Sequence, residues 1–334
     1  MTNATNSTST VRVAVTQAEP CWFDLEGTVQ KTIKLIAEAT ENGAQLVAFP
    51  ECWIPGYPLW IWKFPVRPDL LLKYQKNSLR VDSAEMKSIQ DAAKKHNIVV
   101  VLGYSERSGN SLYMGQAVIL STGELSVTRR KLKPTHMERT VFGDASGGDQ
   151  TLHNVAETSV GRVSGLLCWE HLQPLLKYNT ISQGPQIHVA AWPPLSTPED
   201  PKELYSMSKE GCQAISQVFA MESQSFVLHT GAVISDAGVT LNETAGALIL
   251  SKPSGGSSIV FAPDGKPLTT ELKGTEEGIV YCDLELDTIL ISKGFVDSVG
   301  HYSRPDILSL NVDVRPKKHV TQRKPEVVEV EGVE

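Results

Sequence analysis

The order of strand-like and helix-like segments in the first hundred residues constrains the fold more than any other feature. Apolar side chains occupy every second position of residues 11–15, which is the period of a strand, and recur at helical spacing through residues 26–42. A short apolar run, a second helical pattern and another apolar run follow at residues 45–49, 83–96 and 98–102. This strand–helix–strand–helix–strand order predicts an α/β protein built in layers.

The middle and the end of the chain show a different pattern. Residues 112–120 and 125–129 flank a Ser-Thr-Gly-Glu turn, which predicts a β-hairpin. A helix is predicted over residues 202–223. Further strands are predicted at residues 160–168, 187–191, 226–230, 258–261 and 278–283. Hairpins and crossovers together indicate mixed sheets rather than one purely parallel sheet.

No Pro/Gly/Ser-rich linker and no internal repeat divides the 334 residues, so we expect a single domain over residues 11–316. The first ten residues are polar, with neither a basic start nor an apolar core, and do not read as a secretory signal. We expect residues 1–10 to be a disordered lead-in and the charge-rich residues 317–334 to be an extended tail.

Charge and composition exclude several kinds of partner. The formal net charge of −7 argues against a nucleic-acid-binding protein, which would carry a basic surplus. No window approaches the roughly 18 to 20 apolar residues of a membrane span. The five cysteines are widely spaced and form no C-x-x-C pair, which argues against a disulfide framework or zinc site and favours a reducing, cytoplasmic setting. Because no metal, dinucleotide or phosphate motif is present, we expect no cofactor.

Three polar residues share one placement, directly after a predicted strand: Glu51, Lys131 and Cys168. Enzymes built on sheets gather catalytic groups at strand ends, because the strands hold them in place and the loops leave room for a ligand. Taken singly, each has an ordinary interpretation, since a cysteine is often a small buried apolar residue. Their common placement makes them candidate catalytic residues without deciding the chemistry.

The sequences around these residues resemble the signature motifs of the nitrilases, a branch of the carbon–nitrogen hydrolase family. The motifs occur in the family's order between about residues 11 and 314, so the resemblance covers most of the chain. They are Phe49-Pro50-Glu51 with residues 53–58, the segment 129–139, Cys168-Trp169-Glu170-His171 with residues 172–174, and the segments 187–193 and 300–306.

The resemblance implies an α-β-β-α sandwich, two of which stack into four layers, and hence a homo-oligomer, either a dimer or a spiral filament. It also implies a triad with Glu51 as general base and acid, Lys131 as charge stabiliser and Cys168 as nucleophile. Glu138 matches a second glutamate of the family, for which we expect a positioning role. Lys133 remains an alternative to Lys131, because alternation along a strand would put both on the same face.

Such a triad suits the hydrolysis of a nitrile, whose carbon is a poor electrophile and needs a thiolate. A free cysteine has a pKa of about 8.5 and is mostly protonated at neutral pH. A lysine cation would favour the thiolate, and a carboxylate could accept the thiol proton. Lys131 and a backbone N–H after Cys168 could then stabilise the charge that develops on the nitrile nitrogen. The scheme requires neither a metal nor an organic cofactor.

Aromatic residues beside the motifs are candidates for a substrate pocket, with ordinary core packing as the alternative. They are Tyr57, Trp169 and Trp192. Structural hydrogen-bonding roles, rather than roles as ligands or bases, are expected for His136, His171 and His188.

Within the family, the motifs are most similar to those of enzymes acting on arylacetonitriles and other organic nitriles. We therefore predict hydrolysis of a small-molecule nitrile to a carboxylic acid and ammonia, with some amide as by-product. One alternative is a cyanide hydratase, which more often has asparagine where His171 stands, and another is an amidase of the same fold. A silent scaffold and a thiol redox protein are more distant alternatives. The intact triad argues against the first, and the missing resolving-cysteine motif argues against the second.

Overall fold

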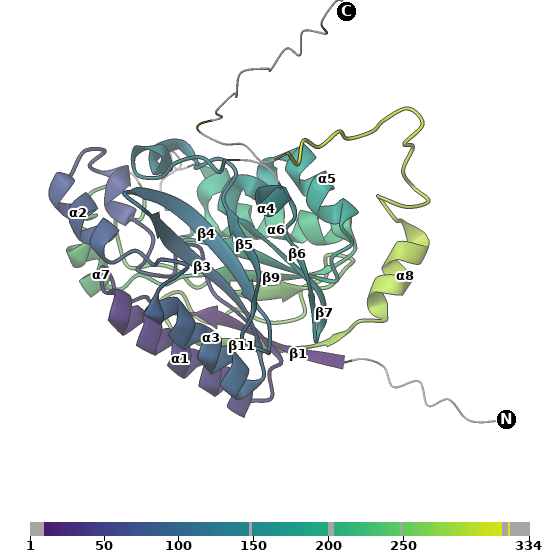
Figure 1. Ribbon diagram of the computed structural model, residues 1–334, viewed down its shortest axis with the longest axis horizontal. Helices are drawn as coiled ribbons and strands as arrows, with labels where there is room; N and C mark the ends of the chain where they lie inside the picture. Colours follow the sequence, from purple (N-terminus) through teal and green to yellow (C-terminus); the bar gives the residue numbers. More distant parts are fainter. Residues whose placement is uncertain (1–9, 147–148, 200–203, 248, 316–319, 321–334) are drawn as a thin grey trace, which may run out of the picture.

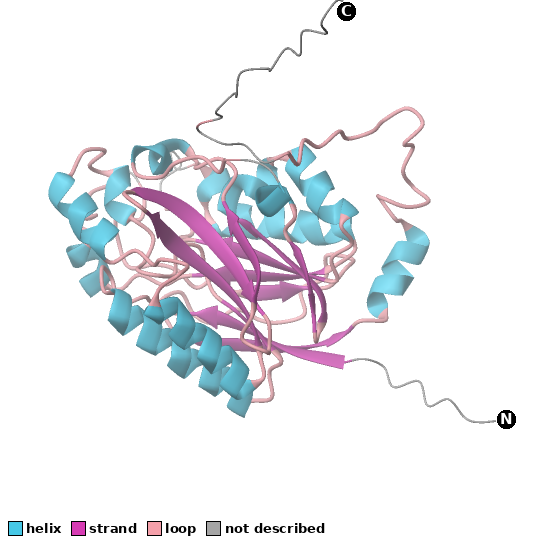
Figure 2. Ribbon diagram, in the orientation of Figure 1, coloured by secondary structure: helices cyan, strands magenta, loops and turns pink. Residues whose placement is uncertain are grey.

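Two β-sheets packed face to face, with helices on both outer faces, make up the fold (Figures 1 and 2). The structure is a computed structural model that describes residues 10–146, 149–199, 204–247, 249–315 and residue 320. The predicted α-β-β-α sandwich is confirmed. The predicted lead-in and charged tail lie outside the described residues, except that Thr10 already belongs to the first strand and Val320 is described.

The first sheet has the strand order β11-β1-β2-β3-β4-β5. Its central strands β1, β2 and β3 run parallel, and the helices α1 and α3 make the crossovers between them, as the alternating pattern predicts. Strands β3, β4 and β5 form antiparallel hairpins, and β11 pairs antiparallel with β1. The bounds are β1 (Thr10–Gln17), α1 (Leu25–Glu41), β2 (Leu46–Ala48), α3 (Ala84–His96), β3 (Val99–Ser108), β4 (Ser111–Ile119), β5 (Leu125–Arg130) and β11 (Gly278–Glu285).

The second sheet has the order β10-β9-β8-β7-β6. Strands β7, β8 and β9 run parallel through the crossover helices α5 and α6, and antiparallel strands form both edges. The bounds are β6 (Val155–Thr158), β7 (Gly161–Leu167), α5 (Pro174–Ser182), β8 (Ile187–Trp192), α6 (Lys209–Ser223), β9 (Phe226–Gly231) and β10 (Ile259–Phe261). Each sheet therefore mixes parallel and antiparallel pairs, as the hairpin and crossover signals predict.

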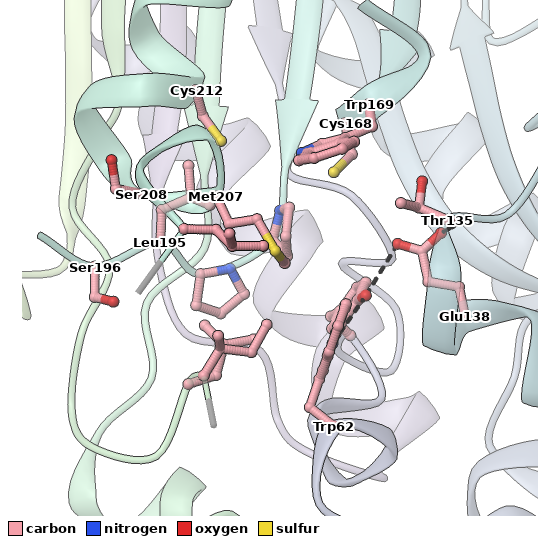
Figure 3. Close-up of a pocket in the computed structure, with 16 residues that line it drawn as sticks. Trp62, Thr135, Glu138, Cys168, Trp169, Leu195, Ser196, Met207, Ser208 and Cys212 are labelled. Atoms are coloured by element: carbon pink, nitrogen blue, oxygen red, sulfur yellow. Dashed lines mark hydrogen bonds between the residues drawn. The ribbon is translucent and has the colours of Figure 1, made fainter. Parts of the chain in front are cut away.

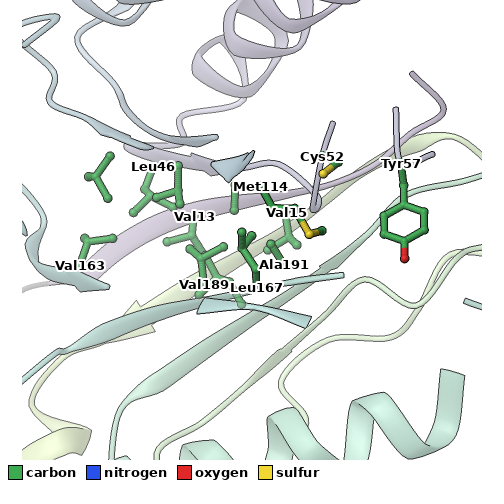
Figure 4. Packing of buried hydrophobic residues seen from close by; sticks show 14 of the residues in the cluster. Val13, Val15, Leu46, Cys52, Tyr57, Met114, Val163, Leu167, Val189 and Ala191 are labelled. Carbon is green, nitrogen blue, oxygen red and sulfur yellow. The ribbon is translucent and has the colours of Figure 1, made fainter. Parts of the chain in front are cut away.

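Alternation along the strands explains why the molecule has several apolar layers. Val13 and Val15 of β1 point into the core between the two sheets (Figure 4). Ala14, between them in sequence, packs instead in the cluster formed with α1 and α3. In the second sheet Leu167 joins the core between the sheets, and Leu166 faces the outer helices. Because successive side chains leave a strand on opposite faces, a strand that is apolar throughout must be covered on both sides.

Several shorter elements were not predicted. They are β6 and α5, whose bounds are given above, and η1 (Leu59–Trp62), α2 (Pro68–Lys76), η2 (His136–Thr140), α4 (Asp149–Leu152), η3 (Cys168–Leu172), η4 (Tyr205–Met207), α7 (Asp236–Leu241) and α8 (Thr288–Phe295). The helix predicted over residues 202–223 begins only at Lys209, because the Ser208 side chain caps it by accepting a hydrogen bond from the Gly211 N–H. In the described part of the chain, no helix has the length and apolar character to cross a membrane.

Candidate active site

Three strand ends from the two sheets meet at one place. Glu51 follows β2, Lys131 follows β5, and Cys168 follows β7. The Lys131 Nζ donates hydrogen bonds to Glu51 Oε1 at 2.8 Å and to Glu138 Oε2 at 2.9 Å. One carboxylate oxygen of each glutamate and the Cys168 sulfur lie within 4.8 Å of one another. The structure therefore brings together all four residues that the sequence singled out as catalytic or positioning.

The two lysines that alternation could not separate occupy different environments. Strand β5 ends at Arg130, so the alternation does not continue to Lys133. Lys131 is buried between the two glutamates, whereas Lys133 extends to the surface and pairs with Asp144. The geometry selects Lys131 as the member of the cluster.

Cys168 lies at a sharp change of backbone direction. The strand predicted over residues 160–168 ends one residue early, and Cys168 is the first residue of η3. Its φ angle is 48°, in the left-handed region that residues other than glycine rarely adopt. Such strained residues persist only where the surroundings impose them, and they concentrate at functional sites. The turn from strand to helix is what brings this side chain to the edge of the sheet.

A buried ion pair that the sequence reasoning missed ties the two halves of the site together. Arg129 donates to both oxygens of Glu170, at 2.8 and 2.6 Å, and both side chains are buried. Glu170 also accepts hydrogen bonds from the backbone N–H groups of Leu132 and Leu167. It therefore links the segment that carries Lys131 to the segment that carries Cys168. The pair lies within two of the motifs, but residues 41 apart give no spacing signal.

We expect Glu170→Gln to lower the free energy of unfolding by about 3–5 kcal/mol, because it leaves the Arg129 guanidinium buried without a counter-charge. Urea denaturation at neutral pH measures the change. Asp82→Asn, which breaks the exposed pair between Arg80 and Asp82, is the matched control and should leave the midpoint nearly unchanged. Equal losses of unfolding free energy in the two variants would contradict a stabilising role for the buried pair of Arg129 and Glu170.

Burial dominates the electrostatics of the cluster. It raises the pKa of Glu51 to about 8, even though Lys131 lowers it. Burial, followed by the charge of Glu51, raises the pKa of the Cys168 thiol well above its usual value. Burial lowers the pKa of Lys131, but Glu138 and Glu51 outweigh it and keep the ammonium charged. Because transfer of the thiol proton to Glu51 leaves the net charge of the site unchanged, burial opposes it less than release of the proton to water.

The same cluster contains donor atoms that a metal ion could use. Within the described ranges, Glu51, Glu138 and Cys168 are the group whose ligand atoms lie close enough together. Both carboxylates, however, are already hydrogen bonded to the Lys131 ammonium. A lysine cation between two carboxylates supplies the positive charge that a metal would otherwise provide, so this donor set suits proton transfer better than metal binding.

A cavity opens in front of the cysteine (Figure 3). Cys168, Tyr57 and Trp169 line it, so two of the three predicted pocket residues do face the cavity. Its other walls are largely apolar and include Trp62, Leu195, Met207, Ile249 and Leu250. Among the described residues, Glu138 is the one charged side chain in the lining. It accepts a hydrogen bond from the Tyr57 hydroxyl at 2.9 Å, and the Trp62 indole donates to that hydroxyl at 3.3 Å.

Trp192 requires a correction, because its side chain does not line the cavity. The indole lies in the core between the second sheet and α6, where it stacks between His171 and His229 and donates to Ser216 Oγ. Alternation along β8 is the reason, since Ala191 faces the other sheet and Trp192 must then face the helices. The backbone carbonyl of Trp192 does reach the site, where it accepts a hydrogen bond from the Glu51 N–H.

A comparison with protein families agrees with this geometry. The model of the carbon–nitrogen hydrolase family matches residues 12–290, which is most of the chain. The chain belongs to the carbon–nitrogen hydrolase family. Among curated relatives, this carbon–nitrogen hydrolase is similar to an arylacetonitrilase of Aspergillus kawachii, with 57% identity over 94% of this chain and 95% of the relative. It is also similar to an arylacetonitrilase of Hypocrea virens, with 55% identity over 95% and 96%. The predicted likeness to arylacetonitrilases is confirmed.

Solved structures of much lower sequence identity show the same fold. A carbon–nitrogen hydrolase from Helicobacter pylori G27 matches with a TM-score of 0.71 at 16% identity, over 90% of this chain and 97% of that one. A mutant amidase of the nitrilase superfamily from Nesterenkonia AN1 matches with a TM-score of 0.59 at 20% identity, over 86% and 95%. The two-sheet sandwich of this carbon–nitrogen hydrolase is thus shared by relatives whose sequences have diverged widely.

Proposed function

We propose that this carbon–nitrogen hydrolase is a nitrilase that converts arylacetonitriles and related aromatic nitriles to carboxylic acids and ammonia. The observation that carries the proposal is the placement of Cys168 at an apolar, aromatic-walled cavity, against a buried cluster of Glu51, Lys131 and Glu138. The identity of 57% to an arylacetonitrilase supports the choice of substrate class.

In the first step of the proposed mechanism, Glu51 accepts the thiol proton of Cys168, and the thiolate attacks the nitrile carbon. The carbon–sulfur bond forms while one carbon–nitrogen π bond breaks, and the nitrogen takes a proton to give a thioimidate. Lys131 and the backbone N–H of Trp169 stabilise the negative charge that develops on this nitrogen. All of these groups act from inside a site from which water is largely excluded, so each interaction is stronger than it would be in water.

In the second step, Glu51 directs a water molecule onto the thioimidate carbon, which gives a tetrahedral intermediate. Cleavage of the carbon–nitrogen bond releases ammonia and leaves a thioester, and a second water then releases the carboxylic acid and restores the thiol. Cleavage of the carbon–sulfur bond instead releases the amide, which accounts for an amide by-product. Glu138 takes the role of positioning residue, because it holds Lys131 while Tyr57 and the Thr135 N–H hold Glu138.

The cavity walls support an uncharged, aromatic substrate. Trp62 and Trp169 contribute aromatic side chains to the walls, and Leu195, Ile249 and Leu250 contribute apolar contacts. A charged group on the substrate would have to lose its hydration without gaining a partner, because Glu138 already binds Lys131 and Tyr57. The lining therefore favours arylacetonitriles over amino- or carboxy-substituted aliphatic nitriles.

The test is turnover of a panel by the purified protein: phenylacetonitrile, benzonitrile, a short aliphatic nitrile, phenylacetamide and cyanide. Ammonia, acid and amide are quantified separately. We expect phenylacetonitrile to give mainly phenylacetic acid and ammonia. Formamide from cyanide with little organic turnover would instead identify a cyanide hydratase, and hydrolysis of the amide alone would identify an amidase. Absence of turnover by folded protein would refute the nitrilase proposal.

The raised pKa of Glu51 makes a prediction about pH. Glu51 must be ionised to accept the thiol proton, and burial raises its pKa from 4.5 to about 8. We therefore expect kcat/KM for phenylacetonitrile to fall as the pH drops below about 8, rather than near the ordinary value of a glutamate. Initial rates between pH 5 and 10 measure the profile. An acidic limb near pH 4 to 5 would show that Glu51 is not the base.

The same shift has the opposite effect on stability. A carboxyl group with a raised pKa in the folded state contributes stability that is complete below its unfolded pKa and is lost as the pH rises through about 8. Glutamine does not ionise, so Glu51→Gln lacks this loss. We therefore expect the difference between the unfolding midpoints, variant minus natural protein, to increase as the pH rises from 5 to 9. A difference that does not change with pH over this window would contradict the buried, high-pKa environment of Glu51.

We propose further that the chain forms a homo-oligomer and works in the cytoplasm. Large apolar side chains are exposed on the outer helices, including Leu175 of α5, Met221 of α6 and Phe295 of α8. Light scattering coupled to size exclusion tests the first point, and Phe295→Glu should shift the mass downward if α8 takes part. The five free thiols support the second point, because a reducing compartment keeps cysteines unpaired.

A further inference from the structure

A buried chain of hydrogen bonds starts at the backbone of the proposed nucleophile. The carbonyl oxygen of Cys168 is 2.7 Å from His171 Nδ1, and His171 Nε2 is 2.9 Å from His188 Nε2. The chain ends where His188 Nδ1 lies 2.7 Å from Ser164 Oγ. All three side chains are completely buried between the second sheet and α6. The mechanism described above uses none of them.

The carbonyl at one end of this series of hydrogen bonds determines which ring nitrogens carry protons. A carbonyl oxygen can only accept, so His171 must donate from Nδ1 and, as a neutral imidazole, accept at Nε2. His188 must then donate from its Nε2, which leaves its Nδ1 to accept from the Ser164 hydroxyl. Burial lowers the pKa of His171 to about 4 and that of His188 well below its usual value, so both rings are neutral at physiological pH.

The rings cannot turn to exchange these partners. His171 stacks on the Trp192 indole, with ring centres 5.5 Å apart, and meets the edge of Phe219. The His188 ring stacks on the Phe219 ring, with ring centres 4.0 Å apart. The core side chain Trp192 is itself held by a hydrogen bond to Ser216. Packing therefore locks the orientation that the hydrogen bonds require.

The contact with the Cys168 carbonyl controls a second group. The C=O of Cys168 and the N–H of Trp169 belong to the same planar trans peptide, so they point in opposite directions. Holding the carbonyl toward His171 in the core turns the Trp169 N–H away from the core. This N–H is the backbone donor that the proposed mechanism assigns to the charged nitrogen. The backbone of Cys168 is strained, with a φ of 48°, so the orientation of this peptide depends on contacts such as the hydrogen bond from His171.

We propose that His171, which donates from Nδ1 to the Cys168 carbonyl and is supported by His188 and Ser164, is a positioning residue that orients the Cys168–Trp169 peptide for binding of the anionic nitrogen in the transition state. The inference rests on the proposed function, because it assigns a role in that reaction. This role accounts for two buried imidazoles next to the cysteine. Burying polar rings is unfavourable unless they are fully hydrogen bonded, and apolar side chains could fill the same core.

A matched pair of variants tests the proposal. His171→Asn places an amide nitrogen where Nδ1 stands and keeps the bond to the Cys168 carbonyl but loses the bond to His188. His171→Gln places its amide near Nε2, so it keeps the bond to His188 and loses the one to Cys168. Each variant breaks one buried hydrogen bond, so their unfolding midpoints should be similar.

The activities of the two variants should differ. We expect kcat for phenylacetonitrile to fall by about 10² to 10³-fold in His171→Gln, with KM little changed, as when one donor to a developing charge is removed. In His171→Asn the loss should be about tenfold or less. If kcat fell equally in both variants, in proportion to their loss of stability, His171 would have only a structural role and the proposal would be overturned.

Acylation of Cys168 by 4-nitrophenyl acetate separates this inference from the nitrilase proposal. The sulfur displaces 4-nitrophenolate to give an acetyl thioester through an oxyanion that the same N–H would bind, and the burst of 4-nitrophenolate is measured. If nitriles are not turned over but the burst rate is faster in His171→Asn than in His171→Gln, the positioning role stands and the nitrilase function fails. Equal burst rates in the two variants would overturn the positioning role.

Should both histidine variants fail to fold, Ser164 provides the second test. Ser164→Ala removes the hydroxyl that donates to the acceptor Nδ1 of His188, and it should lower kcat by about tenfold. Ser164→Thr retains a hydroxyl and should keep kcat close to that of the natural protein. Full activity in Ser164→Ala would show that the hydrogen bond from Ser164 does not support His171 in its role and would overturn the proposal.

Discussion

Replacing Cys168 with alanine should lower kcat for phenylacetonitrile by about 10⁴-fold or more, because it removes the thiol that forms the covalent intermediate in the proposed mechanism. The side chain is small and faces a cavity, so the fold should survive, with a change in the unfolding midpoint of a few degrees at most. Steady-state release of ammonia and a circular dichroism melt measure the two quantities. Mass spectrometry of the natural protein quenched during turnover should show an adduct that Cys168→Ala lacks.

Two further cysteine variants make the result specific. Cys168→Ser keeps a hydroxyl in place of the thiol and should remain strongly impaired, because a hydroxyl is far harder to ionise than a thiol. Cys282→Ala removes a thiol from β11, on the far edge of the first sheet, and should retain activity. Turnover by Cys168→Ala at a rate near that of the natural protein would refute covalent catalysis by this residue.

Lys131→Met should abolish turnover and also lower the free energy of unfolding by about 3–5 kcal/mol. The variant removes the cation from between Glu51 and Glu138, so two buried carboxylates lose their counter-charge. Without the ammonium, burial and the charge of Glu138 act on Glu51 unopposed, so the pKa of Glu51 rises further and the base stays protonated. Guanidinium denaturation and ammonia release measure the two effects, which we expect to appear together.

Lys133→Met is the matched control for this experiment. Lys133 has the same side chain two residues further on, but it lies at the surface and pairs with Asp144. The variant should keep both activity and stability close to those of the natural protein. If Lys133→Met lost activity and Lys131→Met did not, the assignment of the triad lysine would be wrong.

Much of the fold follows from local patterns. The helix predicted at residues 26–42 is α1 within one residue at each end, and the strand at residues 187–191 is β8, which runs one residue further. The helix has a clear helical period and a glycine after its end, and the strand is a short, mostly apolar run typical of a buried strand. The sequence does not predict η3 and α5, because segments of five and nine residues carry too little periodicity. The predicted helix over residues 202–223 also starts before the serine that caps α6.

The residues of the candidate site were likewise predictable only in part. Motif resemblance selected Glu51, Glu138 and Cys168, and the structure brings their side chains together. Resemblance could not locate Trp192, because the face of β8 that meets the helices depends on how the second sheet packs. The role of Glu170 was equally hidden, since its partners are a side chain and two backbone groups that only folding brings close.

The sequence by itself determined which residues carry the proposed chemistry and that each would stand at the end of a strand, because strand period and motif are local properties of the chain. Only the tertiary structure decided which of them meet. Glu51 and Lys131 are 80 residues apart, and their hydrogen bond depends on the order of strands in one sheet. Cys168 reaches them from the other sheet, because the apolar faces of the two sheets pack together and their edges coincide. That packing also separated Lys131 from Lys133 and sent Trp192 into the core. Pairing and packing join residues distant in sequence, and no local pattern encodes their register.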